Sequence, residues 1–222
     1  MKQSYQYFFM DLDGTISDPK EGITKSVAYA LDYYGIKVEN LDTLEKFIGP
    51  PLSDSFQEFY GFDREKSLEA VEKYREYFKD KGIFENELYP GMEQLLKTIT
   101  EQGGKIVLAT SKPEVFAKRI LEYFHIDKYF TFAAGSTLDT TRNKKEDVIR
   151  YALDSLGIAA EEAIMIGDRK HDVIGAKENG MACIGVLFGY GDREELESAG
   201  ADVIVETVEE LEEKMKKLLK TD

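Results

Sequence analysis

Two aspartates stand one residue apart at the end of an apolar run near the start of the chain. Residues 7–10 read YFFM and lead directly into Asp11 and Asp13, which are followed by Gly14 and Thr15. Burying a carboxylate without a partner is costly. The pair therefore belongs either to a turn that reaches water, as Asp and Gly often do, or to a site that needs negative charge.

A second pair of aspartates, Asp168 and Asp172, follows an apolar run late in the chain. In an open parallel sheet, ligands bind beyond the carboxyl ends of the strands, so the two acidic pairs are expected to face one crevice. Like charges repel there unless a cation lies among them. Oxygen ligands favour Mg²⁺, which combines carboxylates with substrate phosphate. The plain alternative for Asp168 and Asp172 is a polar loop before a helix.

Hydroxyl and lysine side chains occupy two further strand ends. Thr110 and Ser111 end one apolar run, while Lys144 and Lys145 precede a helical pattern. A hydroxyl, backbone N–H groups at a helix start and a lysine are what a phosphoryl group requires. Ser111 also has capping-box spacing to Glu114, which predicts a helix cap. The two lysines alone are equally typical of a solvated pair.

Short apolar runs recur along the chain, and within each run the apolarity is continuous rather than alternating. Such runs are typical of strands that are covered on both faces. Between them lie helical patterns with one apolar face, such as the one that opens with Thr207 and Glu210 at capping-box spacing. Strand–helix alternation predicts an α/β fold, with a Rossmann-like parallel sheet core and helices on both faces. The runs cover residues 7–10, 105–110, 129–135, 163–168, 183–189 and 202–206.

The segment 17–87 interrupts this alternation, because it contains no convincing strand. Its apolar residues recur at helical spacing, and Asp42 and Glu45 have the spacing of a capping box. We therefore expect an all-α insert at 17–87 within an α/β core formed by 1–16 and 88–222. The insert is expected to lie over the Asp11–Asp13 pair. Two apolar stripes carry this prediction: Ile23, Val27, Ala30, Leu31 and Tyr34, and then Leu68, Val71, Tyr74 and Phe78.

The composition of the chain limits its possible binding partners and indicates its cellular compartment. The formal net charge of -14 argues against nucleic acid, because counterion release needs a basic face. Cys183 is the single cysteine, which excludes an internal disulfide and fits a cytoplasmic protein. The first residues do not resemble a signal peptide, and no segment reaches the roughly 20 apolar residues of a membrane helix. We therefore expect no nucleic acid and no membrane among the partners.

Four short motifs, taken in order, resemble the signatures of the haloacid dehalogenase-like hydrolase superfamily. They are DLDGT, ATS, a lysine before a helix, and GDRKHD, and the helical insert resembles the helical-cap branch of this superfamily. The stretches FIGPPLSDSF, LATSKP and GSTLDTTRNKKEDVI are similar to bacterial 5′-nucleotidase-like and phosphoglycolate-phosphatase-like members. One departure is Thr140, where these relatives usually carry a glycine that tolerates positive φ.

The resemblance implies roles for the acidic residues. Asp11 would be the nucleophile that forms an aspartyl-phosphate. Asp13 would be the general acid for the leaving alcohol and then the base for water. Mg²⁺ would be held by the carboxylates of Asp11 and Asp168 together with the backbone carbonyl of Asp13, and Asp172 would support this site from behind.

The resemblance also implies a set of substrate-binding groups. Thr110 and Ser111 would bind the phosphoryl oxygens, and Gly14 would lie beside them. The spacing after the TR pair places the motif lysine at Lys145, with Lys144 as the alternative. The positive charge of this lysine would reduce the electrostatic repulsion between Asp11 and the phosphate.

The presence of Asp13 favours phosphate monoester chemistry over the dehalogenase members, which lack a carboxylate there. We expect a Mg²⁺-dependent phosphatase for small phosphorylated metabolites, with a preference for nucleoside 5′-monophosphates. The alternatives are a phosphoglycolate phosphatase, a sugar phosphomutase on the same scaffold, or a binding module with a vestigial site. The substrate and the oligomeric state are left open by the sequence.

Overall fold

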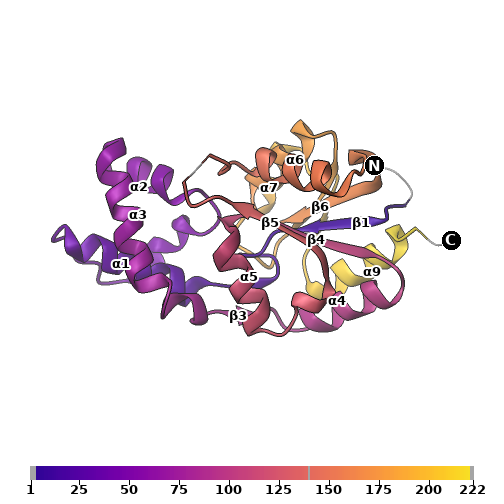
Figure 1. Cartoon of the computed structure of the whole chain (residues 1–222), viewed down its shortest axis with the longest axis horizontal. Coiled ribbons are helices and arrows are strands. Elements are labelled where there is room, and N and C mark those ends of the chain that lie inside the picture. Colours follow the sequence, from indigo (N-terminus) through magenta and orange to yellow (C-terminus); the bar gives the residue numbers. More distant parts are fainter. Residues whose placement is uncertain (1–3, 140, 221–222) are drawn as a thin grey trace. The chain divides into compact units, whose positions relative to one another are not determined.

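The computed structural model describes residues 4–139 and 141–220, so the Thr140 departure lies outside the described residues. The chain forms two compact units. The core unit comprises the chain up to Asp18 together with the chain from Leu88 onward, and the helical unit comprises Pro19–Glu87. Figure 1 follows the chain through both units, and each is described by itself below.

A six-stranded sheet with parallel strand pairs forms the centre of the core unit. Its strand order is β5-β4-β1-β6-β7-β8. Each predicted apolar run overlaps one of these strands, and the predicted α/β parallel core is confirmed. The strands are β1 (Tyr7–Met10), β4 (Lys105–Pro113), β5 (Phe130–Ser136), β6 (Ala163–Gly167), β7 (Ala182–Val186) and β8 (Val203–Val205).

Helices cover both faces of this sheet. On one face α6, α7 and α8 enclose a core with β4, β6 and β7, and α4, α5 and α9 lie on the other face (Figure 1). Short 3-10 helices, η3 (Asp127–Tyr129) and η4 (Ala160–Glu162), precede β5 and β6. The helices are α4 (Met92–Glu101), α5 (Glu114–Tyr123), α6 (Lys145–Leu156), α7 (Lys170–Glu178), α8 (Arg193–Ala199) and α9 (Val208–Leu218).

Two predicted helix caps in the core unit have different outcomes. The Thr207 side chain accepts a hydrogen bond from Glu210 N at 3.2 Å, as the capping-box spacing predicted. The prediction of a cap at Ser111 was wrong, because Ser111 lies inside β4 and α5 begins only after Pro113. The residue before a proline is forced toward extended geometry, so the strand continues through Lys112.

The helical unit contains α1 (Lys20–Tyr33), η1 (Leu41–Phe47), α2 (Leu52–Tyr60), α3 (Arg64–Phe78) and η2 (Gly82–Phe84). The first predicted stripe lies inward, since Ile23, Val27, Ala30 and Leu31 are all buried. The second stripe is correct except for Leu68, which is 42% exposed.

The capping box predicted at Asp42 and Glu45 was wrong. The cap of η1 is Asn40, whose side chain accepts a hydrogen bond from Asp42 N at 3.0 Å. Both acidic side chains instead form ion pairs with Lys20. Asn is among the residues most favoured at this capping position.

A separate two-stranded sheet pairs β2 (Ser17–Asp18) with β3 (Glu87–Leu88). These strands are too short to produce a periodic pattern, which is why the sequence does not predict them. Along the described residues, no helix has both the length and the apolar character needed to cross a membrane.

Candidate active site

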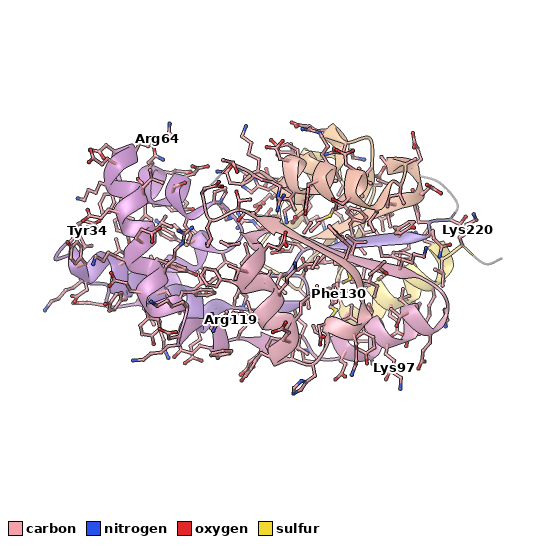
Figure 2. All side chains as sticks on the ribbon, in the orientation of Figure 1. Tyr34, Arg64, Lys97, Arg119, Phe130 and Lys220 are labelled. Carbon is pink, nitrogen blue, oxygen red and sulfur yellow. The ribbon has the colours of Figure 1, made fainter. Side chains whose placement is uncertain are left out.

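Most charged side chains lie on the surface of this protein, as Arg64 and Lys97 do in Figure 2. A small set is buried instead, and every member comes from the motifs singled out above or lies within two residues of one. Within the described ranges this set holds four carboxylates and two ammonium groups. Its members are Asp11, Asp13, Lys112, Lys145, Asp168 and Asp172.

Neighbouring strands bring the two acidic pairs together. Strands β1 and β6 pair with Met10 opposite Ile166, so Asp11 and Asp168 follow adjacent strand ends. The backbone N–H of Asp11 donates to Ile166 O at 3.0 Å, which extends this pairing by one residue. One carboxylate oxygen from each of Asp11, Asp168 and Asp172 lies within 4.8 Å of the others. The three acids therefore face one point.

Lys145 lies at the centre of the acidic cluster. Its Nζ is 2.8 Å from Asp11 Oδ1 and 2.8 Å from Asp172 Oδ1, and it donates to Ala109 O at 3.0 Å. Burial alone would lower the pKa of Lys145, but Asp11 and Asp172 outweigh burial and raise it, so the ammonium stays charged. Lys144 lies apart from this cluster, with a side chain 69% exposed and Nζ 3.8 Å from Glu146.

Asp13 has a cation of its own. Lys112 Nζ donates to both carboxylate oxygens of Asp13, at 2.7 Å and 2.5 Å. Burial raises the pKa of Asp13, and Lys112 opposes that shift. Sequence reasoning missed Lys112 because it expected a helix to start at Ser111. In an extended chain, residues two apart share one side of the strand, so Lys112 could have been found from its spacing to Thr110.

Asp168 is held by two segments of the core unit. It accepts hydrogen bonds from Thr15 Oγ1 at 3.1 Å and from Tyr190 N at 2.9 Å. Gly14 has a φ of 81°, and a Cβ at this position would overlap the Asp168 carboxylate. The glycine in DLDGT is therefore required both by its backbone conformation and by the close approach of Asp168. Neither Thr15 nor Tyr190 was singled out from the sequence.

The remaining motif residues lie around these acids. Thr110 is buried within β4, and its Oγ1 accepts a hydrogen bond from Lys112 N at 3.2 Å. Ser111 is half-buried in the same strand. Asp172 accepts a hydrogen bond from Arg169 N at 3.0 Å, which fixes the start of α7. The structure thus gathers every predicted site residue except Lys144 along one edge of the sheet or beside it.

The electrostatics of the cluster favour a divalent cation. Burial, together with Asp172 and Asp11, raises the pKa of Asp168 well above its ordinary value. Burial raises the pKa of Asp172 to about 6, although Lys145 opposes the shift. When all four buried carboxylates are ionised, the two buried ammonium groups leave an excess of two negative charges within this buried set. A divalent ion with oxygen ligands matches this excess in charge and in donor type.

We expect Mg²⁺ to raise the melting temperature, and to raise it more at about pH 7.5 than at about pH 5. Asp172 has a folded pKa of about 6 against an ordinary value of 3.8. Between these values the folded state binds more protons than the unfolded state, so metal-free stability falls as pH rises through that window. At the lower pH, protons already relieve the repulsion. Thermal unfolding with Mg²⁺ or EDTA at both pH values measures the effect, and equal shifts would contradict this account.

Comparison with known proteins agrees with the geometry. Residues 8–186 match the model of the haloacid dehalogenase-like hydrolase family. A 5′-nucleotidase of Pseudomonas aeruginosa is 50% identical over 192 residues, covering 86% of this chain and 87% of that protein. The tyrosine-protein kinase PtkA of Mycobacterium tuberculosis is 35% identical over 213 residues, covering 95% of this chain and 72% of the kinase.

A solved structure is similar along nearly the whole chain. The crystal structure of a predicted phosphatase from Clostridium acetobutylicum superposes with a TM-score of 0.95 at 52% identity, covering 97% of this chain and 100% of that one. The fold and the gathered motifs define a hydrolase in which aspartates follow parallel strands, and the chain belongs to the haloacid dehalogenase-like hydrolase family. Within that family it is a phosphatase.

Proposed function

We propose that this phosphatase hydrolyses small phosphate monoesters with Mg²⁺ as its cofactor, and that it prefers nucleoside 5′-monophosphates. The observation that carries the Mg²⁺ part is the excess of two buried negative charges around Asp11, Asp168 and Asp172. The similarity to a 5′-nucleotidase at 50% identity supports the substrate preference. We further propose that the protein acts in the cytoplasm, without nucleic acid or membrane partners.

Asp11 is the proposed nucleophile. One carboxylate oxygen attacks phosphorus, the bond from phosphorus to the alcohol oxygen breaks, and an aspartyl-phosphate forms. Lys145 Nζ, 2.8 Å from Asp11 Oδ1, would offset the negative charge that the carboxylate and the incoming phosphoryl group bring together. Thr110 and Ser111, with the backbone N–H groups near the start of α5, are the proposed ligands of the phosphoryl oxygens.

Asp13 is the proposed general acid and base. Its carboxyl gives a proton to the leaving alcohol and later takes one from the water that cleaves the aspartyl-phosphate. The raised pKa of Asp13 suits both roles, because a carboxyl that titrates closer to neutrality exchanges protons more readily. Lys112 contacts both oxygens of Asp13 and so fixes the direction in which the carboxyl points.

Asp11, Asp168 and the backbone carbonyl of Asp13 are the proposed metal ligands, with Asp172 behind them. The cation, when bound, would offset negative charge on Asp11 and on the phosphoryl oxygens. Asp172 and its contacts to Lys145 and Arg169 N would keep the neighbouring carboxylates in place.

The same proposal assigns different roles to two domains of the chain. Residues 1–16 and 88–222 are the proposed catalytic domain, and residues 17–87 are the proposed cap domain that selects the substrate. The compact helical unit, Pro19–Glu87, supports this division. Its buried aromatic residues, such as Phe47 and Phe56, give it a core of its own.

A phosphate-release assay tests the proposal directly. Nucleoside 5′-monophosphates, sugar phosphates and phosphoglycolate are compared with Mg²⁺ present, and we expect the highest kcat/KM for a nucleotide. EDTA should abolish release, and Mg²⁺ but not Ca²⁺ should restore it, because only Mg²⁺ suits a small octahedral site. Substrate loss without an equal amount of free phosphate would instead indicate transfer to another acceptor, as in a mutase.

A further inference from the structure

A loop that none of the four motifs contains lies directly against Asp168. Residues 187–191 read LFGYG and follow β7. Tyr190 N donates to Asp168 Oδ2 at 2.9 Å. A Cβ at Gly189 would overlap the Asp168 side chain and Gly14 O, and a Cβ at Gly191 would overlap Asp168 O. The backbone of this loop therefore packs so closely on Asp168 that positions 189 and 191 have no space for a side chain.

The same loop contacts both core segments that flank the helical unit in the sequence. The Tyr190 hydroxyl donates a hydrogen bond to Asp18 Oδ1. Phe188 packs edge-on against Tyr89, with ring centroids 5.1 Å apart and the ring planes at 66°. Asp18 is the last core residue before the chain enters the helical unit, and Tyr89 follows its return at Leu88. All of these contacts lie within the core unit.

The two flanking segments also contact each other. Tyr89 N donates to Ile16 O at 3.3 Å, next to the β2–β3 pair. A displacement of either segment must therefore stretch the Tyr190–Asp18 hydrogen bond, the Phe188–Tyr89 ring contact, or both. Since the backbone at Gly189 and Gly191 packs directly against Asp168, we expect a displacement of the loop to reach Asp168 through Tyr190 N.

We propose that Tyr190 is a positioning residue, which holds Asp168 through its backbone N–H and Asp18 through its hydroxyl. The loop 187–191 thereby couples the geometry of the metal-binding carboxylate to the segments that lead into and out of the helical unit. This inference rests on the proposed function in one respect, the assignment of Asp168 as a metal ligand. Thermodynamic linkage makes this coupling reciprocal: metal binding should order the segment around Asp18, and ordering of that segment should strengthen metal binding.

The test starts from Tyr190→Phe, which removes the hydroxyl and keeps the ring and the backbone N–H. We expect the Kd for Mg²⁺, measured by titration calorimetry on the resting enzyme, to rise roughly tenfold, as for other groups that orient a metal ligand. Tyr123→Phe is the matched control, because this tyrosine on α5 is 48% exposed and outside the loop. An unchanged Kd in Tyr190→Phe would overturn the proposal.

A double-mutant cycle separates positioning from general packing. Asp18→Asn keeps an oxygen that accepts from Tyr190, so its Kd should stay near wild type. Asp18→Ala should match Tyr190→Phe, and the double variant should be no weaker than either, because both remove the same hydrogen bond. Additive losses would mean that the two residues act separately, and would overturn the proposal.

Hydrogen exchange gives a readout that does not depend on turnover. Mg²⁺ should slow amide exchange in residues 16–18 and 88–90 of the wild type, and much less so in Tyr190→Phe. Equal slowing in both proteins would contradict the coupling. A wild type that binds Mg²⁺ with this response but releases no phosphate would contradict the proposed function alone, whereas a wild type that binds no Mg²⁺ would overturn both.

Discussion

Replacement of Asp11 by asparagine is expected to lower kcat by at least about 10³-fold. Asparagine has nearly the same shape, but its amide is neutral and does not attack phosphorus. Transition-state contacts from Thr110, Lys145 and the backbone would remain, so substrate binding should change far less than kcat. Steady-state phosphate release, with single-turnover measurements of any phosphoenzyme, separates these quantities.

The same substitution should leave the fold intact and raise metal-free stability. Asp11→Asn lowers the excess of buried carboxylates over ammonium groups from two to one, so repulsion among Asp11, Asp168 and Asp172 falls. Lys145 keeps Asp172 and Ala109 O as partners. Asp154→Asn, on the exposed side of α6, is the matched control and should change neither kcat nor stability. Turnover close to wild type in Asp11→Asn would exclude Asp11 as the nucleophile.

The arrangement of the core could be predicted because its physical cause is local. A strand that is buried on both faces must be apolar along its whole length, and the runs at β1 and β6 are. Once these runs are parallel strands, Asp11 and Asp168 follow at the same edge of the sheet. The neighbouring positions of the two acids, with Asp11 N bonded to Ile166 O, agree with that reasoning.

Other features depend on tertiary contacts that leave no local pattern. Lys112 pairs with Asp13, 99 positions away, and Tyr190 contacts Asp18, 172 positions away. The cap predicted at Ser111 was wrong because Pro113 keeps the preceding residue extended, so that the strand continues past the capping-box spacing of Ser111 and Glu114. At η1, Asn40 caps the helix in place of Asp42, and Asp42 and Glu45 pair with Lys20.

The choice between Lys144 and Lys145 is another case that spacing alone leaves open. Both lie at the start of the same helix, and the direction of each side chain separates them. Lys145 is the first residue of α6 and is 4% exposed, whereas Lys144 is the residue before the helix and points to solvent. Adjacent lysines in such different surroundings provide a matched pair for experiment.

Replacement of Lys145 by methionine is expected to lower the free energy of unfolding by about 3–5 kcal/mol at neutral pH without metal. Methionine fills a similar volume, but it leaves Asp11, Asp168 and Asp172 clustered within 4.8 Å with no ammonium group among them. Lys144→Met should change stability by no more than about 0.5 kcal/mol, since its side chain is solvated. Urea denaturation followed by circular dichroism measures both variants.

The pH dependence of this loss identifies its cause. Lys145 opposes the rise in the pKa of Asp172, so this pKa should rise further in Lys145→Met. The folded state then binds protons more readily than the unfolded state, and acidification to about pH 5 should recover part of the lost stability. A packing defect would be insensitive to this change in pH. Turnover should be lost in Lys145→Met even where Mg²⁺ restores its stability, because the ammonium also contacts Asp11, the proposed nucleophile. A Lys144→Met variant that loses turnover while Lys145→Met keeps it would reverse the assignment of the two lysines.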